Sequence, residues 1–396
     1  MKVVFAHTDF RLYWPVRLRR LREYLQECGV ELQVVEIAGK GSPYAFAGRS
    51  DPGGDGWRCL FPEAAMEEIE PRRACGALFG ALDELQPDVV FAGALAFPSG
   101  ATALRWARRR NRRVVIFDDA RRMDVPRNWL VNAVKRRLFA QADAWLLPAP
   151  SHMADYEFWG VSRERMFFGV DVVDNDFFAR HADAARQEAA RWRQELELPD
   201  RFVLGVGRQV PKKNWTRLLE AWEAAALAGW SLVLIGNGPD RNRLEALASD
   251  RVLFRDFVSQ ERLAVYYGLA SALILPSLRG ETWGLVVNEA MAAGLPVLVS
   301  RQCGCAATLV EPGGNGWVFD AWRTEEMVTV LRACMSSTEL KRMGHRSRQI
   351  IADWGLPRFC EGAWSAWQCA MQSPPQRATV ADRLLLGFWN GRYRPL

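Results

Sequence analysis

The sequence lacks the cysteine spacing of a metal site or a disulfide framework. Its eight cysteines include no CxxC pair and no Cys/His cluster with zinc spacing, and Cys303 and Cys305 form a lone CGC. Histidine is also scarce, with four residues in a chain of 396. We therefore expect reduced, mostly buried thiols and no zinc site built from them.

Long apolar runs are absent as well. No stretch approaches the ~20 unbroken apolar residues of a membrane span. The first residues, MKVVFAHTDF, are typical of a buried strand and lack the cleavage site of a signal peptide. There is no internal repeat at solenoid periods and no low-complexity tract. These absences predict a cytoplasmic globular protein.

Positive charge is in excess and unevenly placed. The formal charge is +6, and basic residues cluster in the first half at 17–22, 108–113 and 135–137. Such clusters suit anionic lipid, a phosphorylated acceptor or nucleic acid, and they suit a solvated surface equally well. We keep peripheral contact with an anionic membrane, at its inner surface, as an open alternative, and expect no nucleic-acid partner.

The length and the apolar pattern predict two α/β domains. A chain of 396 residues exceeds one ordinary core. Short apolar runs alternate with helical periods, as in parallel sheets with crossover helices. The expected strands are 3–6, 32–37, 88–91, 114–117 and 144–147 in the first half, then 202–206, 231–235, 252–254, 272–275, 296–299 and 316–319.

We place the boundaries by composition. Residues 1–180 form the expected first domain, the polar stretch 181–200 a linker, and 201–372 the second domain. Pro374 and Pro375 break the chain before another helical pattern, so we expect the tail 373–396 to pack back on the first domain. The Gly-rich segment 39–56 reads as a long loop, and such loops are often functional.

Two loops of the second half have features of an anion site. The stretch FVLGVGR ends at Arg208 and is followed by Lys213 and a helical pattern. Glycine lets a ligand approach the backbone, while the helix start and the two cations favour a diphosphate. A generic exposed basic loop explains this pattern equally well, and ordinary turn chemistry explains Gly236-Asn237-Gly238.

A third block is more specific. Glu281 and Glu289 stand eight residues apart, with Gly284, Gly294 and Pro296 around them. Eight helical residues rise about 12 Å, roughly the reach from a sugar ring past a diphosphate to a ribose. One carboxylate can then bind sugar hydroxyls and the other ribose hydroxyls, while the amides at the helix start face the diphosphate. Spacing alone would also fit two surface glutamates.

From Val206 through Val318 the sequence resembles glycosyltransferase family 4, the retaining sugar transferases with the GT-B fold. The resemblance implies an α/β chain with two Rossmann-like domains, a cleft between them and a C-terminal helix crossing back to the first domain. It implies a metal-independent enzyme without a cofactor. It assigns the donor diphosphate to Arg208 and Lys213, the transferred sugar to Glu281 and the ribose to Glu289.

The same resemblance implies further donor contacts. Phe257 and Val258 would lie by the nucleobase, and the amides of residues 283–285 would face the sugar and phosphate. The full expected donor-binding set, besides the catalytic Arg208, Lys213 and Glu281, is Gly207, Asn237, Gly238, Phe257, Val258, Thr282, Trp283, Gly284, Leu285 and Glu289.

The first half departs from the family pattern. The stretch 7–15 lacks the glycine-rich turn that many members carry, and Asp118 stands where many have a histidine. We take His7, Asp118 and His152 as candidate acceptor-side or cleft residues, with a structural role for His152 as the alternative. The DxD triplet at 174–176 resembles a manganese site of other transferase folds, and we reject that interpretation.

We therefore expect a bacterial-type retaining glycosyltransferase of polysaccharide or glycolipid synthesis. Its donor would be a nucleotide-diphosphate sugar, with UDP ahead of GDP. Its acceptor would be a hydroxyl of a glycan, a lipid-linked sugar or a small molecule. The alternatives are a nucleotide-sugar epimerase of GT-B fold, which the scarcity of histidine disfavours, and a degenerate transferase acting as a binding or scaffold subunit.

Overall fold

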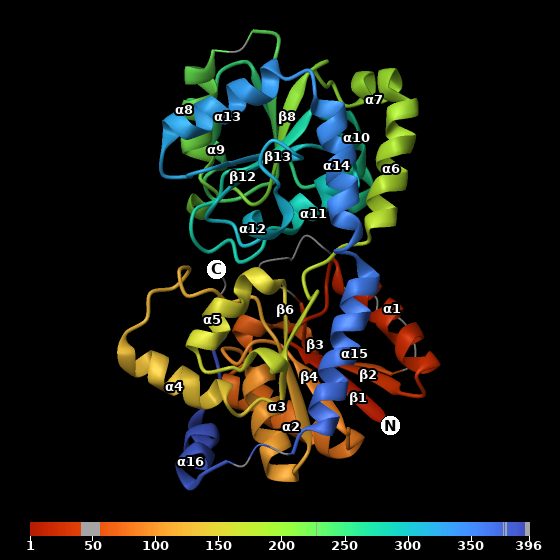
Figure 1. The fold of residues 1–396 in the computed structure, drawn as a ribbon, viewed down its shortest axis with the longest axis vertical. Coiled ribbons are helices and arrows are strands. Elements are labelled where there is room, and N and C mark those ends of the chain that lie inside the picture. The colour runs from red at the N-terminus through yellow and green to blue at the C-terminus, as the bar shows by residue number, and fades with distance from the viewer. Residues whose placement is uncertain (41–55, 227, 375, 377, 393–396) are drawn as a thin grey trace. The chain divides into compact units, whose positions relative to one another are not determined.

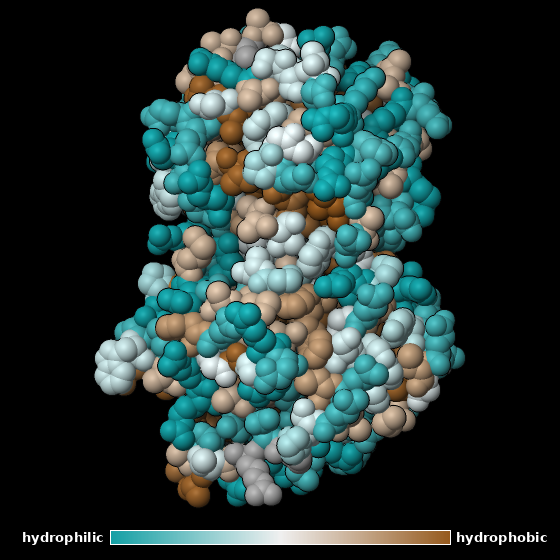
Figure 2. Space-filling model, in the orientation of Figure 1, coloured by the Kyte–Doolittle hydropathy of each residue, from teal (hydrophilic) through white to brown (hydrophobic). Residues whose placement is uncertain are grey.

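The computed structural model describes residues 1–40, 56–226, 228–374, 376 and 378–392 (Figure 1). The chain divides into two compact units. Unit 1 comprises Met1–Arg122, Pro126–Val172 and Leu356–Leu396, and unit 2 comprises Met123–Val125 and Val173–Gly355. Most of the predicted loop 39–56 lies outside the described residues. Figure 2 shows mainly hydrophilic residues on the visible face of each unit.

Unit 1 contains a seven-stranded parallel sheet in the order β3-β2-β1-β4-β5-β6-β7. Buried, β-branched runs explain the central strands, because both faces of a parallel sheet are covered. The bounds are β1 (Lys2–His7), β2 (Glu31–Lys40), β3 (Trp57–Ala65), β4 (Val89–Ala92), β5 (Arg113–Phe117), β6 (Ala144–Leu147) and β7 (Met166–Phe168). The two strands that the sequence did not predict, β3 and β7, lie at the edges, where the apolar signal is short or interrupted by polar residues and proline.

Successive residues along these strands point to opposite faces of the sheet and belong to two hydrophobic cores. Val3 and Phe5 face a core with α1 (Trp14–Glu27) and α15 (Leu356–Gln372). Val4 and Ala6 face a second core, which includes residues of α2 (Pro71–Leu85), α3 (Pro98–Arg110) and α4 (Trp129–Phe139). The short helix α5 (Met153–Phe158) follows the turn Pro150–His152.

Unit 2 contains a six-stranded parallel sheet in the order β10-β9-β8-β11-β12-β13. All six strands match apolar runs in the sequence. They are β8 (Phe202–Val206), β9 (Ser231–Ile235), β10 (Val252–Arg255), β11 (Ala272–Leu275), β12 (Val297–Ser300) and β13 (Gly316–Phe319). The helices are α6 (Asn175–Gln187), α7 (Ala189–Glu195), α8 (Trp215–Ala225), α9 (Arg241–Leu247), α10 (Gln260–Leu269), α11 (Leu285–Ala292), α12 (Ala306–Leu309), α13 (Thr324–Ser336) and α14 (Leu340–Ala352).

The unit boundaries differ from those drawn by composition. The predicted linker 181–200 is part of unit 2, where α6 packs against α10 and α11. Helix α15, assigned by sequence to the second domain, belongs to unit 1 and packs on β5, β6 and β7. The reason is long-range burial: Phe359, Ala363 and Ala366 of α15 fill one face of the first sheet.

The C-terminal helix also crosses back to unit 1. After the Pro-Pro break, α16 (Val380–Phe388) packs against α3 and α4. Its start has a capping box, in which Thr379 and Asp382 bond each other's backbone amides. Asp382 also pairs with Arg137 of α4 at 2.9 Å, and Trp389 donates its indole hydrogen to the carbonyl of Leu95 at 2.7 Å.

All eight cysteines are free, and five of them are buried. None of the helices in the described part of the chain is long and apolar enough to cross a membrane. Within the same residues, no cluster of three or more His, Cys, Asp or Glu side chains is arranged to hold a metal ion.

Candidate functional site

The strand order of unit 2 creates a switch point at the carboxyl ends of β8 and β11. Sheets of this kind bind ligands there, because the chain leaves neighbouring strands in opposite directions and opens a crevice. Gly207 follows β8, and Ser277 follows shortly after β11. The motifs identified in the sequence therefore meet at one edge of the sheet.

Close backbone packing shapes the first loop. Gly207 donates its amide hydrogen to the carbonyl of Ile235 at 2.9 Å, and Gln209 does the same to the carbonyl of Asn237. A Cβ on Gly236 would lie 2.2 Å from the carbonyl oxygen of Gly207, so only glycine fits. The loop after β8 and the turn at 236–238, which the sequence analysis treated separately, thus pack against each other beside Arg208.

Lys213 and Glu281 form an ion pair at the centre of this edge. The Lys213 Nζ lies 2.6 Å from the Glu281 Oε2, and both side chains are largely buried. The Ser277 hydroxyl donates to the same carboxylate oxygen at 2.8 Å. Asn214, next to Lys213, donates its side-chain amide to the carbonyls of Pro276 and Ala321 and so fixes the loop against the strand ends.

The pair keeps Glu281 ionised. Burial raises the pKa of this carboxyl, but attraction to Lys213 and hydrogen bonds from Lys213 and Ser277 outweigh it, so the net pKa lies below its usual value. A carboxylate that is charged at neutral pH can accept hydrogen bonds from ligand hydroxyls. The two residues assigned to different parts of the donor are thus direct neighbours.

Glu289 lies inside α11, and only 1% of its surface is exposed. The hydroxyl of Tyr267, on α10, donates to its Oε2 at 2.6 Å. Glu289 is separated from Glu281 partly by loop, because α11 begins only at Leu285. The expected helical rise of about 12 Å is therefore wrong: the helical part from Leu285 to Glu289 rises about 6 Å.

The loop before α11 is held by the turn at 303–306. Gly304 donates its amide to the carbonyl of Glu281 at 3.0 Å, and Cys305 donates to the carbonyl of Trp283 at 3.2 Å. A Cβ on Gly304 would lie 1.7 Å from the Thr282 carbonyl oxygen. The Trp283 indole is buried and donates to Asn288 Oδ1 at 2.9 Å, which leaves only its backbone for a ligand.

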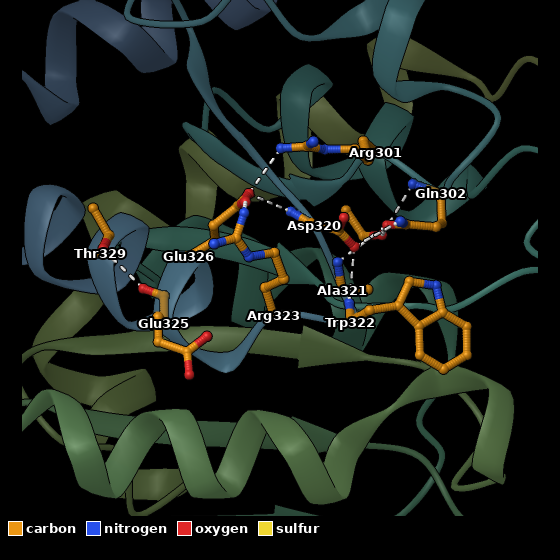
Figure 3. A network of polar contacts seen from close by, with 10 residues as sticks. Arg301, Gln302, Asp320, Ala321, Trp322, Arg323, Glu325, Glu326 and Thr329 are labelled. Carbon is orange, nitrogen blue, oxygen red and sulfur yellow. Dashed lines mark hydrogen bonds and ion pairs between the residues drawn. The ribbon is translucent and has the colours of Figure 1, made fainter.

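A polar network supports this turn from the ends of β12 and β13 (Figure 3). Gln302 donates to Asp320 Oδ1 at 2.8 Å and accepts from the Ala321 amide at 3.1 Å. Glu326 accepts from Arg301 at 2.7 Å and from the Asp320 amide at 2.9 Å. Because Ala321 also accepts from Asn214, the network links the turn to the loop that carries Lys213.

The remaining predicted donor contacts lie at the same edge of the sheet. Asn237 donates to Asp256 Oδ1 at 3.0 Å, which joins its turn to the loop after β10. That loop presents Phe257 as an exposed aromatic ring, with Val258 beside it half-buried. Gly284 is the N-cap of α11 with a φ of 111°, and Leu285 opens the helix.

Of the candidate residues of unit 1, His152 and Asp118 are buried and His7 is partly buried. His7 ends β1, where the rings of Phe10, Trp14 and Phe117 surround it. Burial lowers its pKa to about 4. His152 is almost fully buried, and its Nδ1 lies 3.3 Å from the Ser151 hydroxyl. The alternative that His152 is structural therefore fits its position better than a cleft role.

Asp118 follows β5 and is also buried. Burial raises its pKa, and the charge of Lys135 opposes that rise. Burial in turn lowers the pKa of Lys135 to about 7, although Asp118 opposes the shift. The Lys135 ammonium lies 3.0 Å from the centroid of the Trp159 ring, a cation–π contact. The charge of Lys135 thus acts on Asp118, and no local motif predicted that influence.

Two residues of the unit 2 site escaped the predicted set. Ser277 was part of the family resemblance but not among the site residues, and Tyr267 was not singled out. Tyr267 lies in a largely apolar stretch, and nothing in its spacing from Glu289 indicates contact. A polar hydroxyl in a helix that is otherwise buried was the one available signal, because such groups need a partner.

Comparison with known proteins agrees with this geometry. The family model described as "Glycosyl transferase 4-like domain" matches residues 15–168, and the one described as "Glycosyl transferases group 1" matches residues 186–349. Together the two matches extend over most of both units.

Individual relatives and structures give the same picture. The chain is 26% identical to the sulfoquinovosyl transferase SQD2 of Arabidopsis thaliana over 357 residues, 85% of this chain and 67% of the plant protein. It is 30% identical to a GDP-mannose-dependent phosphatidylinositol monomannoside mannosyltransferase of Mycolicibacterium smegmatis over 173 residues, 40% of this chain and 44% of the relative. The chain spans about half the length of several curated relatives that it matches.

A solved structure of Anabaena HepE in complex with UDP and glucose has the same fold. It superposes with a TM-score of 0.72 at 16% identity, covering 93% of this chain and 99% of HepE. The sheets, the Glu281–Glu289 block and the two family matches lead to one conclusion. This chain belongs to the family-4 type of glycosyltransferases with the GT-B fold.

Proposed function

We propose that this protein is a retaining glycosyltransferase that moves a sugar from a nucleotide-diphosphate sugar to an acceptor hydroxyl. UDP is the first choice of nucleotide and GDP the second. The complex of HepE with UDP supports UDP, and the GDP-mannose-dependent relative supports GDP as the alternative. The acceptor would be a glycan, a lipid-linked sugar or a small molecule.

The observation that carries the proposal is the Lys213–Glu281–Ser277 cluster at the switch point, with Glu289 in the following helix. Burying an ion pair costs folding free energy, because both charges lose their hydration. Binding of a ligand is a reason to keep such a pair. An arrangement that holds one cation and one carboxylate at a ligand-binding edge suits a substrate with both phosphates and hydroxyls. Nucleotide sugars have this composition.

The proposed mechanism is electrostatic. When the bond between the anomeric carbon and the diphosphate oxygen breaks, negative charge grows on the diphosphate. Arg208, Lys213 and the first amides of α11 would stabilise that charge from fixed positions, without reorganising. The acceptor hydroxyl would attack from the face that the diphosphate leaves and pass its proton to the departing phosphate. We propose that this chemistry needs no metal and no cofactor.

Glu281 and Glu289 would position the donor. Glu281, kept ionised by Lys213, would accept hydrogen bonds from hydroxyls of the transferred sugar. Glu289 would accept from the ribose hydroxyls, and the Phe257 ring would lie near the nucleobase. We also propose that the protein works in the cytoplasm and contacts the anionic inner face of the membrane.

A thermal-shift and turnover panel tests the proposal. The protein would be mixed with UDP-, GDP- and ADP-sugars, with and without simple sugar acceptors. A bound nucleotide raises the unfolding temperature by mass action, so the correct base should give the largest shift. Slow release of free sugar should accompany it. If no donor stabilises the protein and none is consumed, the proposal fails.

A catalytically degenerate subunit is the second candidate, and Asp118 motivates it. This residue stands where many family members have a histidine, and burial raises its pKa. The same panel separates the two functions: a degenerate subunit would be stabilised by nucleotide yet consume no donor with any acceptor.

A further inference from the structure

Helix α16 exposes an apolar face in the described part of the chain. Its inner face is anchored to unit 1 by Leu386 and by the ion pair between Asp382 and Arg137. Its outer face consists of Val380, Ala381, Leu384, Gly387 and Phe388, which are all exposed. Their spacing by three and four residues places them on one side of the helix. Figure 2 shows hydrophobic residues at the surface where Figure 1 places α16.

The exposure is large for apolar side chains. The exposed fractions are 76% for Val380, 59% for Leu384 and 82% for Phe388. Single exposed apolar residues are common, but a continuous helix face of them marks a contact surface. We call the outer face of α16 together with the exposed Arg136 and Arg137 near the end of α4 the α4–α16 surface.

The exposed charges of these two helices are positive. Helix α4 has the exposed Arg136 and Arg137 and no acidic residue, while Lys135 packs over the Trp159 ring. Helix α16 contributes the exposed Arg383, and its one carboxylate, Asp382, is buried against Arg137. Protruding apolar side chains with cations beside them are typical of helices that lie at the surface of an anionic bilayer.

We propose that the α4–α16 surface docks unit 1 on an anionic lipid bilayer. The apolar face of α16 would enter the boundary between headgroups and acyl chains, while Arg136 and Arg383 bind lipid phosphates. A second copy of this chain is a poorer occupant, because its basic residues would face those of the first copy. This proposal specifies which surface would make the membrane contact proposed above. Lipid binding by this surface does not depend on sugar transfer, so the test needs no donor.

The test is co-sedimentation of the full chain with vesicles. One set contains equal amounts of phosphatidylglycerol and phosphatidylcholine, and the other contains phosphatidylcholine alone. The wild type should bind the first set, release at high salt, and bind the second set weakly. The variant Leu384→Ser/Phe388→Ser should bind the anionic vesicles roughly tenfold or more weakly, because two apolar side chains no longer enter the lipid. Unfolding temperatures near that of the wild type would show that it folds.

Matched variants separate the two parts of the surface. Leu247→Ser, which changes an exposed leucine at the end of α9 in unit 2, should bind like the wild type. Phe388→Trp should also retain binding, and Arg136→Glu/Arg383→Glu should lose the preference for anionic vesicles. Sedimentation velocity of the wild type and the Ser variant reports self-association.

Four outcomes would overturn the proposal. They are no vesicle binding by the wild type, equal binding to both lipid sets, unchanged binding by the Leu384→Ser/Phe388→Ser variant, and an equal loss in Leu247→Ser. Oligomers of the wild type that disappear in the Ser variant would assign the surface to a second copy instead. Because the donor panel is a separate measurement, failure here leaves the transferase proposal standing.

Discussion

The hydroxyl of Tyr267 donates a hydrogen bond of 2.6 Å to the Oε2 of Glu289, and both side chains are buried. A buried carboxylate needs donors, because an uncompensated charge is costly in a protein interior. One oxygen of Glu289 is thus held by α10, and the carboxylate plane is fixed. We infer that Tyr267 is a positioning residue for the proposed ribose contact.

Replacing Tyr267 with phenylalanine should weaken nucleotide binding. Loss of a hydrogen bond to a charged group costs roughly 1.5–3 kcal/mol, and part of that should appear as weaker UDP affinity. Calorimetry with UDP and with 2′,3′-dideoxy-UDP distinguishes positioning from general damage. Tyr267→Phe should reduce UDP affinity while leaving that of the dideoxy analogue nearly unchanged. The neighbouring Tyr266→Phe serves as the control, and an equal loss for both nucleotides would argue against a ribose role.

Breaking the Lys213–Glu281 pair should nearly abolish turnover. Glu281→Gln and Lys213→Met should each lower kcat by about 10² or more, because fixed charges at a reaction centre typically contribute that much. Since the two act on one another, the double variant should lose less than the product of the single losses. Initial rates of donor consumption measure this. Glu220→Gln and Lys341→Met, both exposed, are the controls; near-normal rates in the site variants would remove the assignments.

Acid should destabilise the protein through His7. Its pKa is lowered to about 4, whereas an unfolded histidine titrates near 6.5. Between these values the unfolded state binds a proton that the folded state does not, so stability falls as pH drops from about 6.5 to about 4 and levels off below. Across this range the free energy of unfolding should fall less in His7→Leu than in the wild type, by up to about 3 kcal/mol, and denaturant unfolding at each pH measures it. The exposed His345→Gln should behave like the wild type, and identical pH profiles for all three would contradict the expectation.

A side chain at Gly304 should displace the loop that carries Glu281. The Cβ of Gly304→Ala would meet the Thr282 carbonyl oxygen, and the backbone must shift. Overpacking of this kind costs roughly 1–3 kcal/mol and should also weaken donor binding. Thermal unfolding and nucleotide titration measure both effects. Gly80→Ala in α2, where a Cβ meets open space, should instead leave stability equal or slightly raised.

Local signals predicted most strands of both sheets. Buried apolar runs identified all six strands of unit 2, because each carries a short apolar run, and the central ones are covered on both faces. The two edge strands of unit 1 were missed: β3 is half-exposed and contains charged residues and a proline, and β7 has only three residues. Residues 356–372 were assigned to the second domain by their position in the chain, whereas the structure places α15 in unit 1, because no local signal tells on which sheet a segment packs.

The sequence by itself determined the family, because that depends on short motifs: Arg208 to Lys213 and Glu281 to Glu289. The tertiary structure alone decided which side chains pair. Lys213 reaches Glu281 across 68 residues, and Tyr267 reaches Glu289 across 22. Such partners are chosen by how helices pack on strands, and packing depends on contacts between segments that no local spacing records.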